Sequence, residues 1–392
     1  MTVVDIRNIF SNRNIELFDV NDSFIYYAEE KNEEGHNNLF ILEYNRATRR
    51  ERLVTNYSLE DPTFVEHIFA FEKTIVLILE NGTNSMWLIE IDKQSGIELN
   101  RRKVVCTGSF SECMAWDSEH LLIYMAPDEA NEQMFKKYKE ITGCDCLCYL
   151  YNLRTNKKFL VKSPMIAKLG CDNIKLIEVQ GEKYIVLLDP FGEEEVKEHY
   201  YREQRWINAD IRDNIWLCNL AEVEEQLENG SEEISKKCIA SADIKALVRY
   251  IGIRDEKVYF RAKEFRTGTE KLCSYDAFTN SLDVEATLTD PEDNRTFYLI
   301  EEKPVKVFCI TKGNTKVYVK GIVSSEADLS YDNSLGEFMT CIENRFVVTQ
   351  RSIYSEESKN TFTYYYIYDS QLDQSESYEC ICHVYGDTLV LY

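Results

Sequence analysis

The 392-residue sequence predicts an all-β fold built from repeated four-stranded units, and three observations support this prediction. A short apolar strand that ends on Asn or Asp and leads into a turn returns roughly every 50 to 60 residues. Other short runs between these copies alternate apolar and polar residues, which is the pattern of half-buried β-strands. Gly and Pro are sparse, at 15 and 6 residues, so no long flexible linker interrupts the series. Repetition of this kind is typical of stacked supersecondary units.

The clearest copies of the repeated strand end on a polar anchor residue. Asn45 opens Asn-Arg-Ala-Thr and Asp92 opens Asp-Lys-Gln-Ser-Gly, where the side chain can accept a hydrogen bond from its own backbone in a tight hairpin turn. We therefore predict a structural role for the anchors and no catalytic one. The clearest anchors are Asn45, Asp92, Asn152, Asn219, Asp276 and Asp369.

Strand and turn signals divide the chain into seven units. Four short strands per unit are the content of one propeller blade. In the sixth unit the fourth strand is weak, and the third ends on Gly321 without an Asn or Asp anchor. The sequence thus predicts one β-propeller domain, residues 1–392, with seven four-stranded blades. The units cover residues 15–54, 65–106, 113–161, 174–239, 247–286, 297–321 and 338–382.

The closure of the ring has two alternatives. The terminal segments Thr2–Ile6 and Thr388–Tyr392 both have strand character. In the preferred arrangement seven blades close the ring, and a terminal strand helps to join its ends. In the other arrangement both ends build an eighth blade. Either one covers sheet edges that would otherwise expose unpaired backbone.

The repeated pattern of apolar strand, anchor residue and turn also resembles that of a known family. In Ile89-Glu-Ile-Asp-Lys-Gln-Ser-Gly96 and its copies, the chain resembles bacterial β-propellers with degenerate repeats, akin to WD40-like and TolB-like propellers. The resemblance implies an architecture only. The Gly-His and Trp-Asp pair of true WD40 repeats does not recur, and Trp116-Asp117 occurs once. No functional residue is carried over from the family.

Charge and hydropathy exclude several classes of partner. A net charge of −23 repels nucleic-acid phosphates and anionic membrane surfaces, so we expect neither a nucleic-acid nor a membrane partner. No apolar stretch is long enough to span a bilayer, and the first residues lack an export signal, so we expect a cytoplasmic protein. Thirteen cysteines are then expected to be reduced.

Two long insertions interrupt the repeat in the adjacent blades three and four, at residues 128–143 and 192–212. The first places Met134, Tyr138 and Ile141 at helical spacing, and a further helix is predicted near Leu220 to Glu228. Both insertions join the second strand to the third, so they leave from the same face and are predicted to form a cap.

The cap has two interpretations. A ligand or partner docks there, or the helices simply cover an exposed rim. On the first interpretation, the predicted binding residues are Tyr138, His199, Tyr200, Tyr201 and Trp206.

The sequence contains only weak patterns for metal or cofactor binding. Cys144, Cys146 and Cys148 alternate along a strand, but a spacing of about 7 Å per two residues is too wide for one tetrahedral ion. Buried cysteines on one strand face are the preferred interpretation. His199 lies between Glu195 and Glu203 at helical spacing, where a cation site is conceivable and a solvated helix face is preferred. We expect no metal and no cofactor, since no phosphate-binding or dinucleotide motif is present.

The preferred function is therefore non-enzymatic: a propeller that binds a protein, peptide or small ligand on the face capped by residues 128–143 and 192–212. The alternative is a hydrolase or lyase, carboxylate- or metal-dependent, with its site in the central channel. Converging Asp, Glu, His or Arg side chains at the channel would favour the enzyme. An apolar groove beside the insertions would favour binding.

Overall fold

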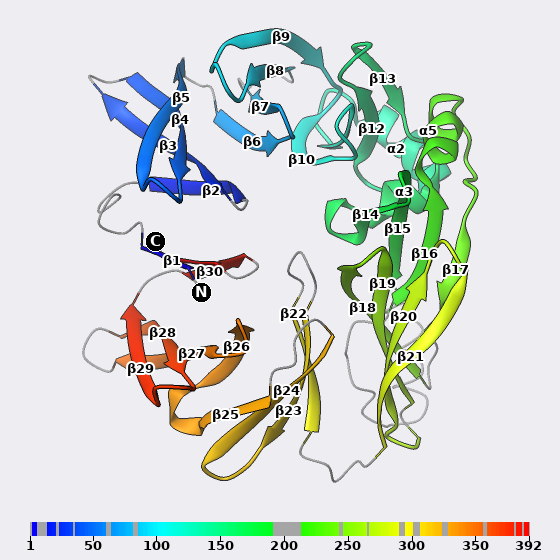
Figure 1. Ribbon diagram of the computed structural model, residues 1–392. Helices are drawn as coiled ribbons and strands as arrows, with labels where there is room; N and C mark the ends of the chain where they lie inside the picture. The colour runs from blue at the N-terminus through cyan, green and yellow to red at the C-terminus, as the bar shows by residue number, and fades with distance from the viewer. Residues whose placement is uncertain are drawn as a thin grey trace.

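Seven antiparallel four-stranded sheets follow one another around the ring in Figure 1, one for each predicted unit. The fold is taken from a computed structural model, which describes residues 2–5, 14–20, 23–33, 36–59, 64–80, 85–190, 213–242, 246–264, 266–289, 295–300, 306–323, 328–355, 359–379, 382–385 and 388–391. Within each sheet the strands pair in chain order, so every blade is a simple meander. The predicted β-propeller, with its degenerate repeats, is confirmed.

The strand bounds agree closely with the predicted units. Blades one to three contain β2 (Asn14–Val20), β3 (Phe24–Glu33), β4 (His36–Asn45), β5 (Arg50–Leu59), β6 (Phe64–Ala70), β7 (Thr74–Glu80), β8 (Ser85–Asp92), β9 (Glu98–Val105), β10 (Ser109–Ala115), β11 (His120–Ala126), β12 (Leu147–Asn152) and β13 (Lys157–Leu160). Blades four and five contain β14 (Ile174–Val179), β15 (Glu182–Pro190), β16 (Asp213–Asn219), β17 (Lys237–Ala240), β18 (Ala246–Arg254), β19 (Lys257–Glu264), β20 (Glu270–Asp276) and β21 (Ser281–Leu288). Blades six and seven contain β22 (Arg295–Ile300), β23 (Lys306–Lys312), β24 (Lys316–Val323), β25 (Asp328–Asp332), β26 (Glu337–Ile342), β27 (Phe346–Ser355), β28 (Asn360–Asp369) and β29 (Gln374–Glu379). The weak fourth strand of the sixth unit is β25, and the third strand runs past Gly321 to Val323.

The two ends of the chain form an additional sheet of three strands. β1 (Thr2–Asp5) pairs in parallel with β31 (Thr388–Leu391), which pairs antiparallel with β30 (Cys382–Tyr385). This sheet lies between blade seven and blade one (Figure 1). Seven four-stranded blades are present, as in the preferred arrangement, but both ends of the chain build the sheet that joins them, as in the alternative.

The anchor residues make the turns that the sequence predicts. In each of the six, the side-chain oxygen Oδ1 accepts a backbone N–H two or three residues further along the chain. Asn219 does this at the start of a helix, so its turn becomes an N-cap. The donating amides belong to Thr48, Ser95, Thr155, Glu222, Thr279 and Leu372.

The core consists of apolar layers between neighbouring blades. Side chains from blades one and two form one cluster, and a larger cluster joins blades two, three and four. Further clusters join blades four and five, five and six, and six and seven. Leu389 of the closing sheet is fully buried against Ile342, Val348 and Ile367 of blade seven. Each blade thus buries its faces against its neighbours, as stacked sheets require.

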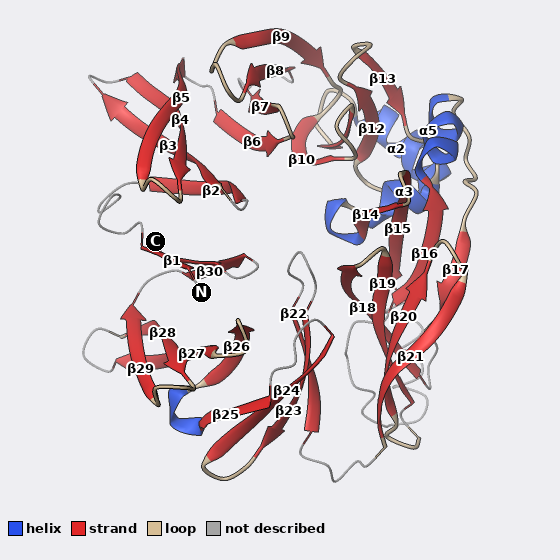
Figure 2. Ribbon diagram, in the orientation of Figure 1, coloured by secondary structure: helices blue, strands red, loops and turns tan. Residues whose placement is uncertain are grey.

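Helices gather beside blades three and four (Figure 2). α2 (Glu132–Thr142) lies in the first insertion, α3 (Pro164–Leu169) joins blade three to blade four, and α5 (Leu220–Glu228) follows β16. The short 3-10 turns η1 (Cys171–Asn173) and η2 (Asn333–Leu335) complete the set among the described residues. The helices predicted in the first insertion and near residues 220–228 are confirmed. The second insertion, residues 192–212, lies outside the described residues.

Connections between antiparallel strands alternate between the two faces of the ring. His120 pairs with Asn152 at one face, whereas Met125 pairs with Leu147 at the other, where the connection contains α2. The β13–β14 connection, with α3, starts from this second face, and α2 contacts α3. The β16–β17 connection, with α5, starts from the opposite face, beside the turn that precedes His120. No helix among the described residues combines the length and apolar character that crossing a membrane requires.

Candidate functional site

α2 is fixed to the propeller by its buried face. Phe135 and Tyr138 point into the large cluster of blades two to four. The Tyr138 hydroxyl donates to the Val161 carbonyl at 2.6 Å and accepts the Cys148 amide at 3.3 Å. At its C-terminus the helix ends on Gly143, which adopts the left-handed conformation with φ 69° and donates its N–H to Lys139. Tyr138, one of the predicted binding residues, thus ties α2 to the ends of β12 and β13.

The opposite side of α2 exposes apolar side chains. Met134 is 38% exposed and Ile141 is 45% exposed, so the predicted stripe of Met134, Tyr138 and Ile141 is divided between solvent and core. Together with Leu160 these two side chains border a hollow of about 330 Å³. We call it the α2 hollow. Its lining residues are Gln133, Met134, Lys137, Tyr138, Ile141, Leu160 and Lys162.

Two lysines give the lining of the α2 hollow a positive charge. Lys137 and Lys162 are the charged residues among its lining, in a chain whose net charge is −23. Another lysine of α2, Lys139, pairs with Asp145, with Nζ 2.6 Å from Oδ1. An apolar floor between two ammonium groups can bind an apolar side chain flanked by carboxylates.

Of the five predicted binding residues, Tyr138 borders this hollow. His199, Tyr200, Tyr201 and Trp206 all lie outside the described residues. Met134, Ile141 and the two lysines were visible in the sequence, but periodicity alone gave no sign of which helix face would be buried.

The wall of the central channel carries a second cavity, of about 560 Å³. It is formed by the innermost strands of three consecutive blades, β10, β14 and β18. Lys175 and Glu178 are the charged residues among its described lining, and the others are aliphatic residues, Met114, Tyr250 and Gly252. The described lining thus offers one cation and one carboxylate, and it does not show the converging Asp, Glu, His or Arg side chains that would favour the enzymatic alternative.

The prediction that Cys144, Cys146 and Cys148 share one buried strand face holds for Cys148 and is wrong for the other two. Cys148 is fully buried on β12, whereas Cys144 and Cys146 precede the strand and are half-buried. Burial raises the pKa of the Cys146 thiol and, more strongly, that of Cys148. Raised thiol pKa values oppose the thiolate form that binds metal. Within the described residues, these cysteines belong to no group of three ligand atoms close enough for one ion.

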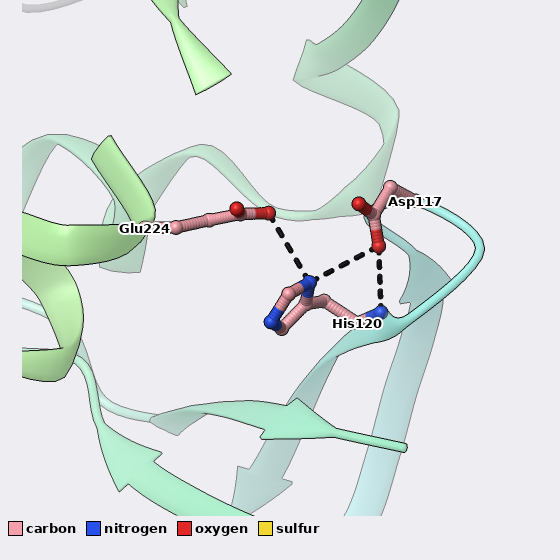
Figure 3. Close-up of side chains that lie close together, drawn as sticks. All are labelled: Asp117, His120 and Glu224. Carbon is pink, nitrogen blue, oxygen red and sulfur yellow. Dashed lines mark hydrogen bonds and ion pairs between the residues drawn. The ribbon is translucent and has the colours of Figure 1, made fainter. Parts of the chain in front are cut away.

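Asp117, His120 and Glu224 form a compact cluster between blades three and four (Figure 3). His120 Nδ1 lies 3.1 Å from Asp117 Oδ1 and 3.2 Å from Glu224 Oε1. The side chains are 9%, 11% and 19% exposed, in the order His120, Asp117, Glu224. Asp117 and His120 flank the β10–β11 turn, and Glu224 comes from α5. The cluster therefore connects a turn of one blade to a helix of the next.

The imidazole of this cluster is basic. Burial by itself favours the neutral ring, but the hydrogen bonds and charges of Asp117 and Glu224 outweigh it and raise the pKa of His120 to about 10. His120 Nε2 lies 2.8 Å from Asn152 Nδ2, a contact that suits the neutral ring. The negative charge of the two carboxylates stabilises the protonated ring, which is why the pKa of His120 rises in spite of burial. Hydrogen bonds from His120 and from backbone amides also hold the pKa of Asp117 below its usual range, against the effect of burial.

The three ligand-type atoms lie within 4.8 Å of one another, close enough for a metal ion. Asp117 Oδ1 is already occupied, since it accepts the backbone N–H groups of Glu119 and His120, each at 2.7 Å. A metal would also require His120 Nδ1 to lose its proton. The donor set as it stands suits hydrogen bonding better than metal binding, and we describe it as a clasp between blades.

Comparison with known proteins finds likeness only among solved structures. No family model and no curated protein matches the sequence. Among solved structures, an uncharacterised protein from Listeria monocytogenes is similar at 11% identity and a TM-score of 0.40, with 96% of each chain covered. The β-propeller domain of the Trilobed protease from Pyrococcus furiosus is similar at 12% identity and a TM-score of 0.40, covering 93% of this chain and 92% of that one.

A post-proline cleaving enzyme from Rickettsia typhi is similar at 12% identity and a TM-score of 0.45. The match covers 93% of this chain and 50% of the enzyme, so the chain spans about half of that protein's length. The propeller architecture is given by the sheets themselves. These likenesses carry no function to this chain.

Proposed function

We propose that this propeller is a non-enzymatic scaffold that binds a partner protein at the α2 hollow. The observation that carries the proposal is the exposure of Met134 and Ile141 on a helix whose other face is firmly anchored. An insertion that only covered the rim would be expected to direct its apolar side chains inward. Here two large apolar side chains remain in solvent beside Leu160 and border a concave surface.

The proposed occupant is a segment of the partner that presents an apolar side chain between carboxylates. Its apolar group would fill the α2 hollow, and its carboxylates would approach Lys137 and Lys162. Most of this acidic chain would repel such a segment, so the two lysines supply specificity for this surface. Anchoring of α2 by Tyr138 supports the proposal further, because a rigid surface loses less entropy on binding.

His199, Tyr200, Tyr201 and Trp206 keep their place in the proposal as a predicted second part of the surface. Their insertion follows β15 and leaves from the face at which α2 leaves β11. Deletion of residues 193–207 tests them. If the deleted protein folds and binds each partner as the full chain does, these four residues have no part in binding.

The first experiment is a quantitative pull-down from a lysate of the native host with three forms of the protein. They are the wild type, the double variant Met134→Ser/Ile141→Ser, and the control Leu282→Ser/Val284→Ser. Leu282 and Val284 are 56% and 54% exposed on β21 in blade five, so the control removes a matched apolar surface elsewhere. The proposal expects a partner that is recovered by the wild type and the control and depleted with the α2 variant. Equal recovery of every protein by all three forms contradicts it.

Charge reversal provides the second experiment. In Lys137→Glu/Lys162→Glu the hollow keeps its apolar floor and loses its positive rim. We expect this variant to lose the same partner, and we expect wild-type binding to weaken as salt is raised. A partner retained by the charge-reversed protein would exclude an acidic binding segment.

A further inference from the structure

A cavity distinct from the α2 hollow lies between α3, the end of β15 and the residues that precede β17. Its volume is about 450 Å³, which is within the range of small-ligand sites. Its lining combines apolar, cationic, anionic and hydroxyl groups. The lining residues are Ser163, Pro164, Met165, Lys168, Asp189, Glu232, Glu233, Ile234 and Lys236.

Ser163 gives the strongest indication of a ligand. The residue is 1% exposed, and its Oγ is buried without a hydrogen-bond partner among the described residues. It precedes α3, but its side chain does not cap that helix. A buried hydroxyl without a partner destabilises a protein, and a ligand that bonds to it would remove that cost.

Two lysines are held near the cavity from different elements. Lys236 Nζ lies 4.4 Å above the ring of Trp216, a cation–π contact that limits its position. Lys168 lies beside the C-terminal end of α2. A Cβ atom on Gly143 would lie only 2.7 Å from Lys168 Nζ. The negative end of the α2 dipole favours an ammonium group at this place.

Carboxylates complete the lining. Asp189 lies near the end of β15, where burial raises its pKa and the nearby Lys236 and Lys168 act in the opposite direction. Glu232 and Glu233 come from the segment between α5 and β17. A simple anion in this cavity would meet three carboxylates, and a simple amine would meet two ammonium groups. A ligand with both charges can pair with both sets.

We propose that this cavity binds a short peptide with free termini. The peptide carboxylate would pair with Lys168 and Lys236 and accept the Ser163 hydroxyl, and its ammonium group would pair with Asp189 and the two glutamates. Pro164, Met165 and Ile234 provide apolar walls for its side chains. The proposal is independent of partner docking at the α2 hollow.

Calorimetric titration of the full chain with trialanine tests the proposal. Trialanine should bind, while N-acetyl-trialanine and trialanine amide, which lack one terminal charge each, should bind about tenfold more weakly or worse. Ser163→Ala should also weaken trialanine binding by about tenfold and leave the thermal unfolding temperature of the free protein unchanged or raised. If Ser163 had only a structural role, its replacement would lower the unfolding temperature or leave trialanine binding unchanged.

The control variants separate this site from the rest of the surface. Lys236→Gln should weaken trialanine binding, whereas Lys103→Gln, an exposed lysine on β9, should leave it unchanged. Met134→Ser/Ile141→Ser should also leave it unchanged, since these residues do not line the cavity. Absence of binding up to about 10 mM trialanine overturns the proposal. Equal binding of the three peptides, or of wild type and Ser163→Ala, overturns it as well.

Discussion

His120 at the start of β11 and Glu224 in α5 are joined by a contact of 3.2 Å across the boundary between blades three and four. The residues are distant in sequence, and each sits where its own element is firmly held. Asp117 accepts both the imidazole and the backbone amide of His120, and Asn219 caps the helix that carries Glu224. Lys183 of blade four approaches Asp117 Oδ2 at 3.9 Å, a second link between the same blades.

The first prediction concerns the pH dependence of this clasp. The pKa of His120 is raised in the folded protein from 6.5 to about 10. The folded state therefore holds this proton more tightly than the unfolded state does. Its contribution to stability is fully present below pH 6.5 and is lost as pH rises through about 10. Glu224→Gln should lower the free energy of unfolding by about 1 to 2 kcal/mol at pH 6 and by less at pH 10.5.

Urea denaturation of the wild type and Glu224→Gln at the two pH values measures this difference. Glu225→Gln, on an exposed position of the same helix, is the control and should follow the wild type at both pH values. A Glu224→Gln effect of the same size at pH 6 and pH 10.5 would show that the charged imidazole is not involved.

The second prediction concerns the anchoring of α2. Tyr138→Phe keeps the ring in the core but removes the hydroxyl that serves Val161 and Cys148. Two buried backbone groups then lose a partner, and we expect the free energy of unfolding to fall by about 1 to 3 kcal/mol. Tyr318→Phe, at a tyrosine that is 54% exposed, should change it by less than about 0.5 kcal/mol. Chemical denaturation compares the two variants, and equal effects would contradict the anchoring role.

The third prediction concerns the anchor residues of the repeat. Asn45 Oδ1 accepts the Thr48 amide at 2.8 Å, so Asn45→Ala should destabilise the protein by about 1 kcal/mol. Asn45→Asp should preserve most of the stability, because a carboxylate can accept the same amide. Thermal unfolding of both variants tests whether the hydrogen bond that this side chain accepts, and not merely its size, stabilises the turn. If Ala and Asp behave alike, the turn does not depend on the acceptor.

The fourth prediction concerns ring closure. Leu389 is fully buried against blade seven, and Leu389→Ala should lower the free energy of unfolding by about 2 to 4 kcal/mol. Leu372→Ala, at a leucine that is 60% exposed, should have little effect. Equal tolerance of both changes in a denaturation experiment would show that the closing sheet does not stabilise the ring.

Local patterns in the sequence predicted the blades, because each strand and turn depends on residues close to it. Period-two alternation located the strands, and the Asn45 and Asp92 turns follow from side chains that bond to their own backbone. The ring closure was harder, because pairing of β1 with β31 depends on the geometry of the whole ring. Both closure arrangements require the same strand patterns at the two ends of the chain, so these patterns did not distinguish them.

The candidate sites depended on tertiary contacts and could be predicted only in part. Helical spacing grouped Met134, Tyr138 and Ile141, but only the packing of α2 against blade three decided that Tyr138 is buried and the other two are exposed. The clasp brings together Asp117, His120 and Glu224, and no local signal connects the last of these with the first two. Ser163 gave no signal at all, since a buried hydroxyl without a partner is visible only in three dimensions.

The most direct test of the central proposal is the affinity of the propeller for its partner once the pull-down has identified it. Isothermal titration should compare wild type, Met134→Ser/Ile141→Ser and Leu282→Ser/Val284→Ser, with circular dichroism confirming that all three are folded. Docking at the α2 hollow predicts at least about a tenfold weaker dissociation constant for the α2 variant and an unchanged one for the control. A dissociation constant that is the same for all three proteins would contradict it.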